Sequence, residues 1–145
     1  MEIHCDGSFI SKSQPAAYGV VAVNHHGQVC DGGAETLLCS TPIEAEARAL
    51  LKGLKLAQEY GSECIVQSDC QVLVKDLGKG KSRWPWRCAA WMGSMINILG
   101  SNPTIKVKEV PRAMNVRADW VAQSKARSNL PVDWINILDL IFDLL

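Results

Sequence analysis

The sequence lacks the features that would place it in a membrane or mark it for secretion. No apolar run approaches the roughly 18 residues that a membrane-spanning helix needs. The N-terminus has no basic stretch followed by an apolar core, as a signal peptide would have. No low-complexity tract, internal repeat or interdomain linker interrupts the 145 residues. We therefore expect one globular domain, residues 1–145, in an intracellular protein or an excised domain, with no membrane partner.

The cysteines do not form a metal-binding pattern. None of the six belongs to a C-x-x-C pair, and no cluster of cysteine and histidine has zinc spacing. Several lie in apolar, strand-like runs, which favours buried free thiols. The six are Cys5, Cys30, Cys39, Cys64, Cys70 and Cys88.

The net charge is zero, but the charges are unevenly distributed along the chain. Residues 1–78 contain ten acidic and five basic side chains, whereas residues 79–127 contain two acidic and ten basic ones. Such a distribution suits a polyanion held near a group of carboxylates. Solvated faces that never meet would give the same pattern, so charge alone does not decide between the two.

Periodicity and turn residues predict an α/β fold. Strands are expected at residues 1–9, 63–68 and 104–110, with a hairpin at 17–35 that turns at His26-Gly27. Helices are expected at 40–61, 69–80, 84–100, 115–128 and 132–145. Ser40 or Thr41 can cap the first helix, and Gly61 can end it. Gly78 and Gly80 are expected to close the second helix. This order implies a mixed five-stranded sheet flanked by helices.

Two glutamates near the start of the first helix point in different directions. Glu44 leads a stripe of charged residues, and we expect it on the solvated face. Glu46 leads the stripe Ala49, Leu50, Gly53, Leu54 and Ala57, which is the core face. A carboxylate at the head of an apolar stripe must be neutral, paired or metal-bound, unless it is a half-exposed acid that favours the helix dipole.

Three aspartates occupy positions that local chemistry alone could explain. Asp6 stands in the middle of the first strand, where it is either part of an Asp-Gly turn or a ligand on the sheet face. Asp69 follows a buried strand, either as a helix N-cap or as a ligand at the carboxyl edge of a sheet. Asp119 lies in the first turn of a helix, where the dipole also favours it.

Taken together, the four acids give the sequence a recognisable pattern. Asp6-Gly7-Ser8, "AEARAL" with Glu46, "VQSDCQVLV" with Asp69 and "VPRAMNVRADWVA" with Asp119 follow one another on these elements. The arrangement resembles the ribonuclease H family over about residues 1–128. The pieces "TPIEAEARALLKGL" and "VPRAMNVRADWVA" resemble its plant branch, which includes domains of retroelement reverse transcriptases.

The resemblance implies a metal-dependent endoribonuclease that hydrolyses the RNA strand of RNA–DNA hybrids. In the family, four acids hold two Mg²⁺ ions, for which Mn²⁺ can substitute. The resemblance assigns the catalytic and metal-binding roles to Asp6, Glu46, Asp69 and Asp119. Asp6 would bridge both ions, Glu46 and Asp69 would flank one ion, and Asp119 would hold the other. Without metal, some of these clustered acids should stay protonated.

The resemblance also implies contacts with the nucleic acid. Gly7 and Ser8 would let the backbone approach the RNA sugar, whose 2′-hydroxyl distinguishes RNA from DNA. Residues near 79–87 match the position of a basic protrusion that handles substrate, although packing could equally explain its tryptophans. The expected substrate contacts are Gly7, Ser8, Thr41, Lys79, Lys81, Arg83, Trp84, Arg112 and Asn115.

The sequence departs from the family pattern in two places. Many ribonucleases H carry a histidine in the loop before the last catalytic helix, but here that loop is "VPRAMN". Arg112 occupies the region and cannot act as a base. Pro42-Ile43 stands where the bacterial type has two asparagines that contact the hybrid. A catalytically weak or inactive module that binds nucleic acid or a protein is therefore the alternative. A proofreading-type exonuclease ranks last, because Ser8 stands where a glutamate is usual.

The tail at residues 129–145 is predicted to form an amphipathic helix. Asp133, Asn136, Asp139 and Asp143 make one polar stripe, and the rest of the circumference is apolar. The apolar face either packs on the sheet of its own chain or mediates self-association or contact with a partner domain.

Overall fold

The computed structural model describes residues 1–79, 84 and 86–143. Its five strands are β1 (Glu2–Ser8), β2 (Ala16–Val23), β3 (Val29–Leu37), β4 (Cys64–Ser68) and β5 (Ile105–Glu109). They form one sheet in the order β3-β2-β1-β4-β5. β1, β2 and β3 pair antiparallel, whereas β4 pairs parallel with both β1 and β5. The prediction of a mixed five-stranded sheet is confirmed.

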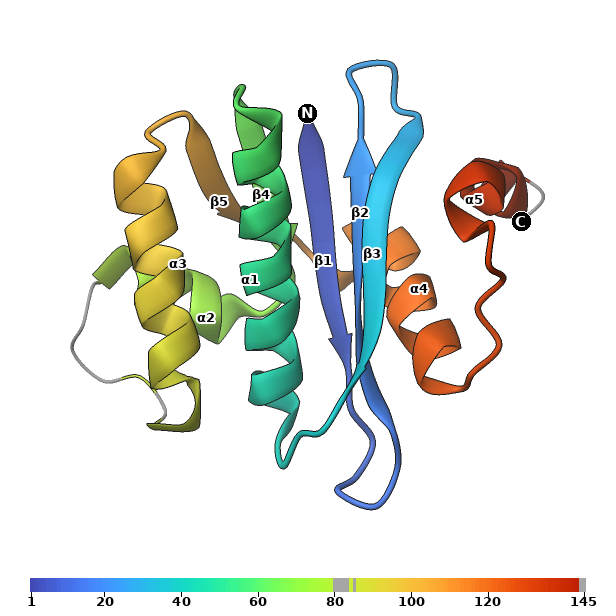
Figure 1. Ribbon diagram of the computed structural model, residues 1–145, viewed down its shortest axis with the longest axis horizontal. Helices are drawn as coiled ribbons and strands as arrows, with labels where there is room; N and C mark the ends of the chain where they lie inside the picture. The colour runs from blue at the N-terminus through green and yellow to red at the C-terminus, as the bar shows by residue number, and fades with distance from the viewer. Residues whose placement is uncertain (80–83, 85, 144–145) are drawn as a thin grey trace.

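Helices cover both faces of this sheet (Figure 1). α1 (Pro42–Tyr60) and α3 (Ala89–Ser101) lie on one face, and α2 (Gln71–Lys79) lies beside them near β5. α4 (Val116–Ala126) and α5 (Trp134–Asp143) lie on the opposite face. In Figure 1, α4 passes behind the strands and α5 lies to the right of β3. Two short 3₁₀ helices, η1 (Trp86–Cys88) and η2 (Arg112–Met114), precede α3 and α4.

The strands divide their apolar side chains between the two layers. In β2, Val20 and Ala22 belong to the core beneath α1, whereas Val21 and Val23 belong to the core beneath α4. This alternation follows from the two-residue period of a strand. None of the helices in the described part of the chain has the length and apolarity needed to span a bilayer.

The start of α1 corrects one prediction about its two glutamates. Thr41 is the N-cap residue, but its side chain does not bond to the helix backbone. Instead, Glu44 Oε2 accepts hydrogen bonds from the Ser40 N–H (2.9 Å) and from Thr41 Oγ1 (2.8 Å). Glu44 is therefore buried, and the prediction that it lies on the solvated face is wrong. Ser40 and Thr41 explain the burial, because they bond to Glu44 from positions before the helix. Helical periodicity gives no information about residues outside the helix.

Several element boundaries also differ from the expected ones. Gly61 ends α1 with φ +63, as predicted. Gly78 lies inside α2 instead of closing it, and Gly80 lies outside the described residues. The helix expected at 84–100 consists of η1 followed by α3. All six cysteines are free, but only Cys5, Cys64 and Cys88 are buried.

The C-terminal helix packs on the sheet of its own chain, the first of the two arrangements expected for it. Asp139 Oδ2 accepts a hydrogen bond from the Val29 N–H (3.0 Å), and Asp139 Oδ1 lies 3.5 Å from Arg117 Nη2 on α4. The Phe142 ring meets Trp120 edge-on, with centroids 6.3 Å apart. These contacts join α5 to both β3 and α4.

Gly19 controls how closely α4 approaches the sheet. A Cβ at this position of β2 would lie 2.7 Å from both the Ala118 carbonyl oxygen and the Ala122 nitrogen. Gly19→Ala should therefore lower the free energy of unfolding by about 1–3 kcal/mol, because backbone atoms must move to accommodate the methyl group. Urea denaturation measures this change. As a control, Gly93→Ala in α3, where a Cβ meets open space, should stabilise the protein by about 0.5–1 kcal/mol. Equal effects of the two substitutions would contradict the explanation.

Candidate active site

Three carboxylates from three elements meet at one edge of the sheet. Asp6, Glu46 and Asp69 each offer an oxygen, and these oxygens lie within 4.8 Å of one another. Because β1 and β4 are parallel, their carboxyl ends lie at the same edge, where Asp6 and Asp69 stand. Asp6 is in β1 and almost fully buried, and Asp69 follows β4 directly. Glu46 reaches this edge from the first turns of α1.

Glu46 is held in place by the backbone of β1. The Gly7 N–H donates a hydrogen bond of 2.9 Å to Glu46 Oε1. A Cβ on Gly7 would lie 2.5 Å from the Ala45 carbonyl carbon, so only glycine allows β1 and α1 to approach this closely. Glu46 Oε2 is buried and has no hydrogen-bond partner among the described residues. A buried oxygen without a partner fits a proton or a cation at this point.

Asp119, the fourth acid expected in the site, is not part of this group of three but lies next to Asp6. It lies in the first turn of α4, as predicted, and its proximity raises the pKa of both Asp6 and Asp69. Gln123 Nε2 donates hydrogen bonds to Asp119 Oδ1 (3.0 Å) and Oδ2 (2.9 Å). Gln123 is not among the residues predicted for the site, although its spacing of four residues from Asp119 on one helix was a usable signal.

Burial and the neighbouring carboxylates shift the pKa of Asp6 and of Glu46. Burial raises the pKa of Asp6, and the neighbouring Glu46, Asp119 and Asp69 raise it further. Burial also raises the pKa of Glu46, although the hydrogen bond from Gly7 opposes this effect. These shifts agree with the prediction that clustered acids retain protons when no cation is bound.

Arg112 provides a positive charge beside the cluster. It is exposed on η2. Burial raises the pKa of Asp69 and of Glu46, and the Arg112 guanidinium partly opposes this rise. Arg112, Ser8 and Asp119 line one cleft of about 610 Å³, whose wall also includes Arg127. Ser8 and Arg112, both expected to contact substrate, are thus accessible next to an acid of the site.

Asn115 has a different position from the one expected of a substrate contact. Its side chain is fully buried, and its Nδ2 donates a hydrogen bond of 2.8 Å to the carbonyl oxygen of Cys5. Asn115 therefore joins the start of α4 to β1 at the residue before Asp6. The expected direct contact of Asn115 with substrate is not compatible with this burial.

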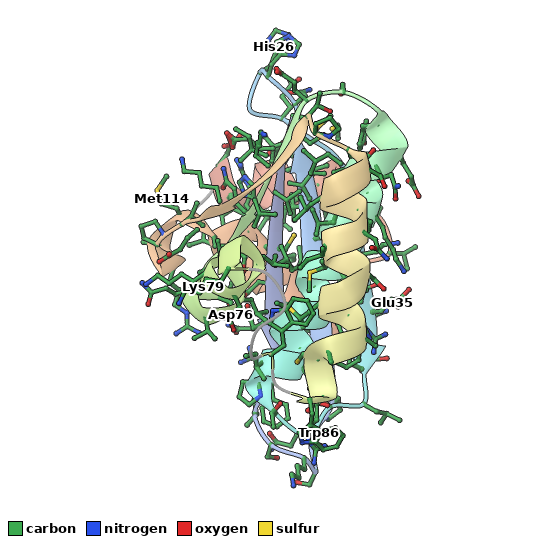
Figure 2. All side chains as sticks on the ribbon, turned by 90° about the vertical axis from the view of Figure 1, so that its left-hand side faces the viewer. His26, Glu35, Asp76, Lys79, Trp86 and Met114 are labelled. Carbon is green, nitrogen blue, oxygen red and sulfur yellow. The ribbon has the colours of Figure 1, made fainter. Side chains whose placement is uncertain are left out.

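Of the other expected substrate contacts, the described ones, Thr41, Lys79 and Trp84, do not line the cleft beside Asp119. The Thr41 hydroxyl is occupied by Glu44. Lys79 is exposed at the end of α2 (Figure 2). Trp84 is half-buried and packs against the core beneath α1, whereas Trp86 is 79% exposed at one end of the molecule (Figure 2). Lys81 and Arg83 lie outside the described residues.

Comparison with known proteins agrees with this fold. Residues 4–125 match the sequence profile of the reverse transcriptase-like family. A search of curated proteins found no match. Among solved structures, ribonuclease H1 from the archaeon Halobacterium salinarum is 26% identical, with a TM-score of 0.78 over 88% of this chain and 97% of that one.

Two further structures share the fold at lower identity. The N-terminal ribonuclease H domain of a Mycobacterium tuberculosis protein is 23% identical, with a TM-score of 0.78 over 88% of this chain and 94% of that one. LC11-RNase H1, isolated from compost, is 21% identical in its complex with an RNA/DNA hybrid, with a TM-score of 0.77 over 90% of this chain and 99% of that one.

The mixed sheet with its acidic edge is that of a ribonuclease H-like domain. Since the profile match covers most of the chain, the protein belongs to the reverse transcriptase-like branch of the ribonuclease H family.

Replacing Asp6 by asparagine should stabilise the metal-free protein at alkaline pH. The raised pKa of Asp6 in the folded state means that the folded protein binds a proton which the unfolded chain releases above pH of about 4. Stability therefore falls as the pH rises from that value towards the folded pKa. Asp6→Asn should raise the free energy of unfolding by about 1–3 kcal/mol at pH 8, and by much less at pH 4.

Chemical denaturation in the presence of a chelator measures both values. Asp133→Asn, at an exposed position, should change the free energy of unfolding by less than about 0.5 kcal/mol at either pH. If the Asp6→Asn protein is no more stable than the parent at pH 8, the buried carboxyl group of Asp6 does not destabilise the folded protein, and the prediction is wrong.

Proposed function

We propose that this domain is a metal-dependent endoribonuclease that hydrolyses the RNA strand of RNA–DNA hybrids. The observation that carries the proposal is the meeting of Asp6, Glu46 and Asp69 within 4.8 Å, with Asp119 beside them. Like charges at this distance repel one another strongly. A fold that gathers them at a partly open edge must offset this repulsion with protons or with a cation, and carboxylate oxygens are the ligands that Mg²⁺ prefers.

The residues fit two divalent cations, Mg²⁺ or Mn²⁺. Asp6, Glu46 and Asp69 would hold the ions together with Asp119, which lies next to Asp6. The unpartnered Glu46 Oε2 supports this assignment. When bound, the ions would supply a more acidic water and would stabilise the leaving oxygen. Gly7 and Gln123 orient Glu46 and Asp119 through their hydrogen bonds.

The substrate class is supported by the similar structures. LC11-RNase H1 and a foamy virus protease–reverse transcriptase were both solved in complex with an RNA/DNA hybrid. In this chain, Ser8 and Arg112 line the cleft beside Asp119. Arg112 would contact a phosphate there, and Ser8 would lie near the sugar that carries the 2′-hydroxyl.

A second candidate is a module that binds hybrid and turns it over slowly or not at all. The observation that favours it is η2, where Arg112–Met114 contains no side chain that could exchange a proton near neutral pH. Binding without cleavage would identify this candidate.

Asp69→Asn should abolish hybrid cleavage. Losing a metal-binding oxygen at a half-exposed position removes a ligand without emptying the core. Because losing even a residue that supports a ligand typically costs 10–100-fold, we expect a loss of at least about 100-fold. The assay is cleavage of a labelled RNA–DNA hybrid at millimolar Mg²⁺ and Mn²⁺. Asp76→Asn on α2 is the control and should cleave normally. A folded parent protein that cuts no hybrid with either ion would refute the proposal.

Gln123→Leu should weaken the cation site at Asp119. The substitution keeps the approximate volume and removes both hydrogen bonds to the carboxylate. We expect the Mg²⁺ concentration at half-maximal cleavage to rise about tenfold. The Mg²⁺-dependent rise in melting temperature should need correspondingly more Mg²⁺. Gln58→Leu on the exposed side of α1 should leave both curves unchanged. If Gln123→Leu leaves them unchanged too, Gln123 does not position Asp119.

A further inference from the structure

The sheet face opposite α1 is covered over only part of its width. α4 packs against β1, β2 and β3, and α5 packs against β3. On β4, Val66 points towards Gly53 of α1, so Ile65 points to the other face, where it is 40% exposed. Lys106 and Lys108 of β5 are exposed on the same face, because Ile105 and Val107 pack in the core beneath α1 and α3. We call Ile65, Lys106 and Lys108 the open face.

Figures 1 and 2 show this arrangement from two directions. In Figure 1, β5 lies beyond β4 at the edge of the sheet, away from α4 and α5. In Figure 2, α3 lies on one side of the sheet, and Met114, just before α4, lies on the other. The far end of the open face is a hollow of about 580 Å³ whose lining includes Glu2, Ile65 and Lys106.

The strand register connects the open face to the acids of the active site. Lys108 pairs with Gln67 on β4, and Gln67 pairs with His4 on β1. Two residues further along β1, Asp6 points to this same face, and an Asp69 oxygen lies within 4.8 Å of an Asp6 oxygen. The residue after Lys108 on β5, Glu109, pairs with Ser68, the residue before Asp69. A lysine side chain at position 108 lies next to any nucleic-acid strand that passes over the acids.

Two acids, Glu2 and Glu63, line the same hollow as Lys106. Among the described residues, no carboxylate forms a salt bridge with Lys106 or Lys108. Glu109 points to the opposite side of β5 by strand alternation. Glu2 is on this face, and its Oε1 lies 3.4 Å from His4 Nε2. Because burial lowers the pKa of His4, this contact leaves the negative charge of Glu2 in place. Two ammonium groups and the apolar Ile65 face solvent together.

We propose that the open face binds the sugar–phosphate backbone of the nucleic-acid substrate next to the cleavage point. Rows of lysine that neutralise phosphates release counterions and make binding depend on salt. Ile65 would pack against the apolar edge of a sugar. The open face thus extends the substrate site beyond the cleft lined by Ser8 and Arg112. This inference rests on the proposed function, because it takes the hybrid as the substrate.

The test measures hybrid affinity in a protein that cannot cleave. In the full chain carrying Asp69→Asn, Lys106→Gln and Lys108→Gln are introduced together, and binding of a labelled RNA–DNA hybrid is measured between 50 and 200 mM salt. The slope of log K against log salt should become less negative by about 1.8, since each phosphate contact contributes about 0.9. At 0.1 M salt the affinity should fall about tenfold. The control pair, Lys52→Gln with Lys55→Gln on α1, should change neither value.

Three outcomes would overturn the inference, and each has a different cause. Unchanged slope and affinity, while the unsubstituted protein cleaves the hybrid, would refute the open face alone. Unchanged affinity together with self-association of the variant in sedimentation would show that the lysines protect the exposed edge of β5. If the unsubstituted protein neither binds nor cleaves the hybrid, the proposed function fails, and the open face fails with it.

Discussion

The close approach of β1 to the first turns of α1 is the contact on which the active site depends. At Gly7 the strand comes so near the helix that a Cβ would meet the Ala45 carbonyl carbon at 2.5 Å. The Gly7 N–H then binds Glu46. Without this contact, an acid on a helix in one layer could not share a site with Asp6, whose side chain points to the other layer. The parallel pairing of β4 with β1 adds Asp69 at the same edge.

Gathering these acids conflicts with the stability of the fold. Burial and mutual repulsion raise the pKa of Asp6 and Glu46, so the metal-free fold carries protons that it would otherwise release. The surrounding polar groups reduce this conflict without removing it. The charge of Arg112 favours the ionised form of Asp69, and Asn115 fixes the backbone just before Asp6. Because repulsion among the carboxylates remains, a divalent cation would bind the folded state in preference to the unfolded chain.

The sequence predicted the acids better than it predicted their supports. Asp6, Glu46 and Asp69 could be found because each interrupts an apolar pattern or follows a buried strand, and such interruptions are visible along the chain. Glu44 was misplaced because its burial depends on hydrogen bonds from Ser40 and Thr41, which lie before the helix. The roles of Asn115 and Gly7 depend on contacts between segments 110 and 39 residues apart. The periodicity of apolar residues within one helix or strand cannot predict contacts between such distant segments.

The C-terminal helix shows how a segment beyond the family profile can still act on the site. The profile ends at residue 125, and α5 begins at Trp134. Asp139 of α5 binds both the backbone of β3 at Val29 and the guanidinium of Arg117. Arg117 lies two residues before Asp119 in the first turn of α4, and Asn115 ties the same turn to β1. α4 is therefore fixed from the sheet and from α5, so that Asp119 depends on a helix outside the matched region for part of its placement.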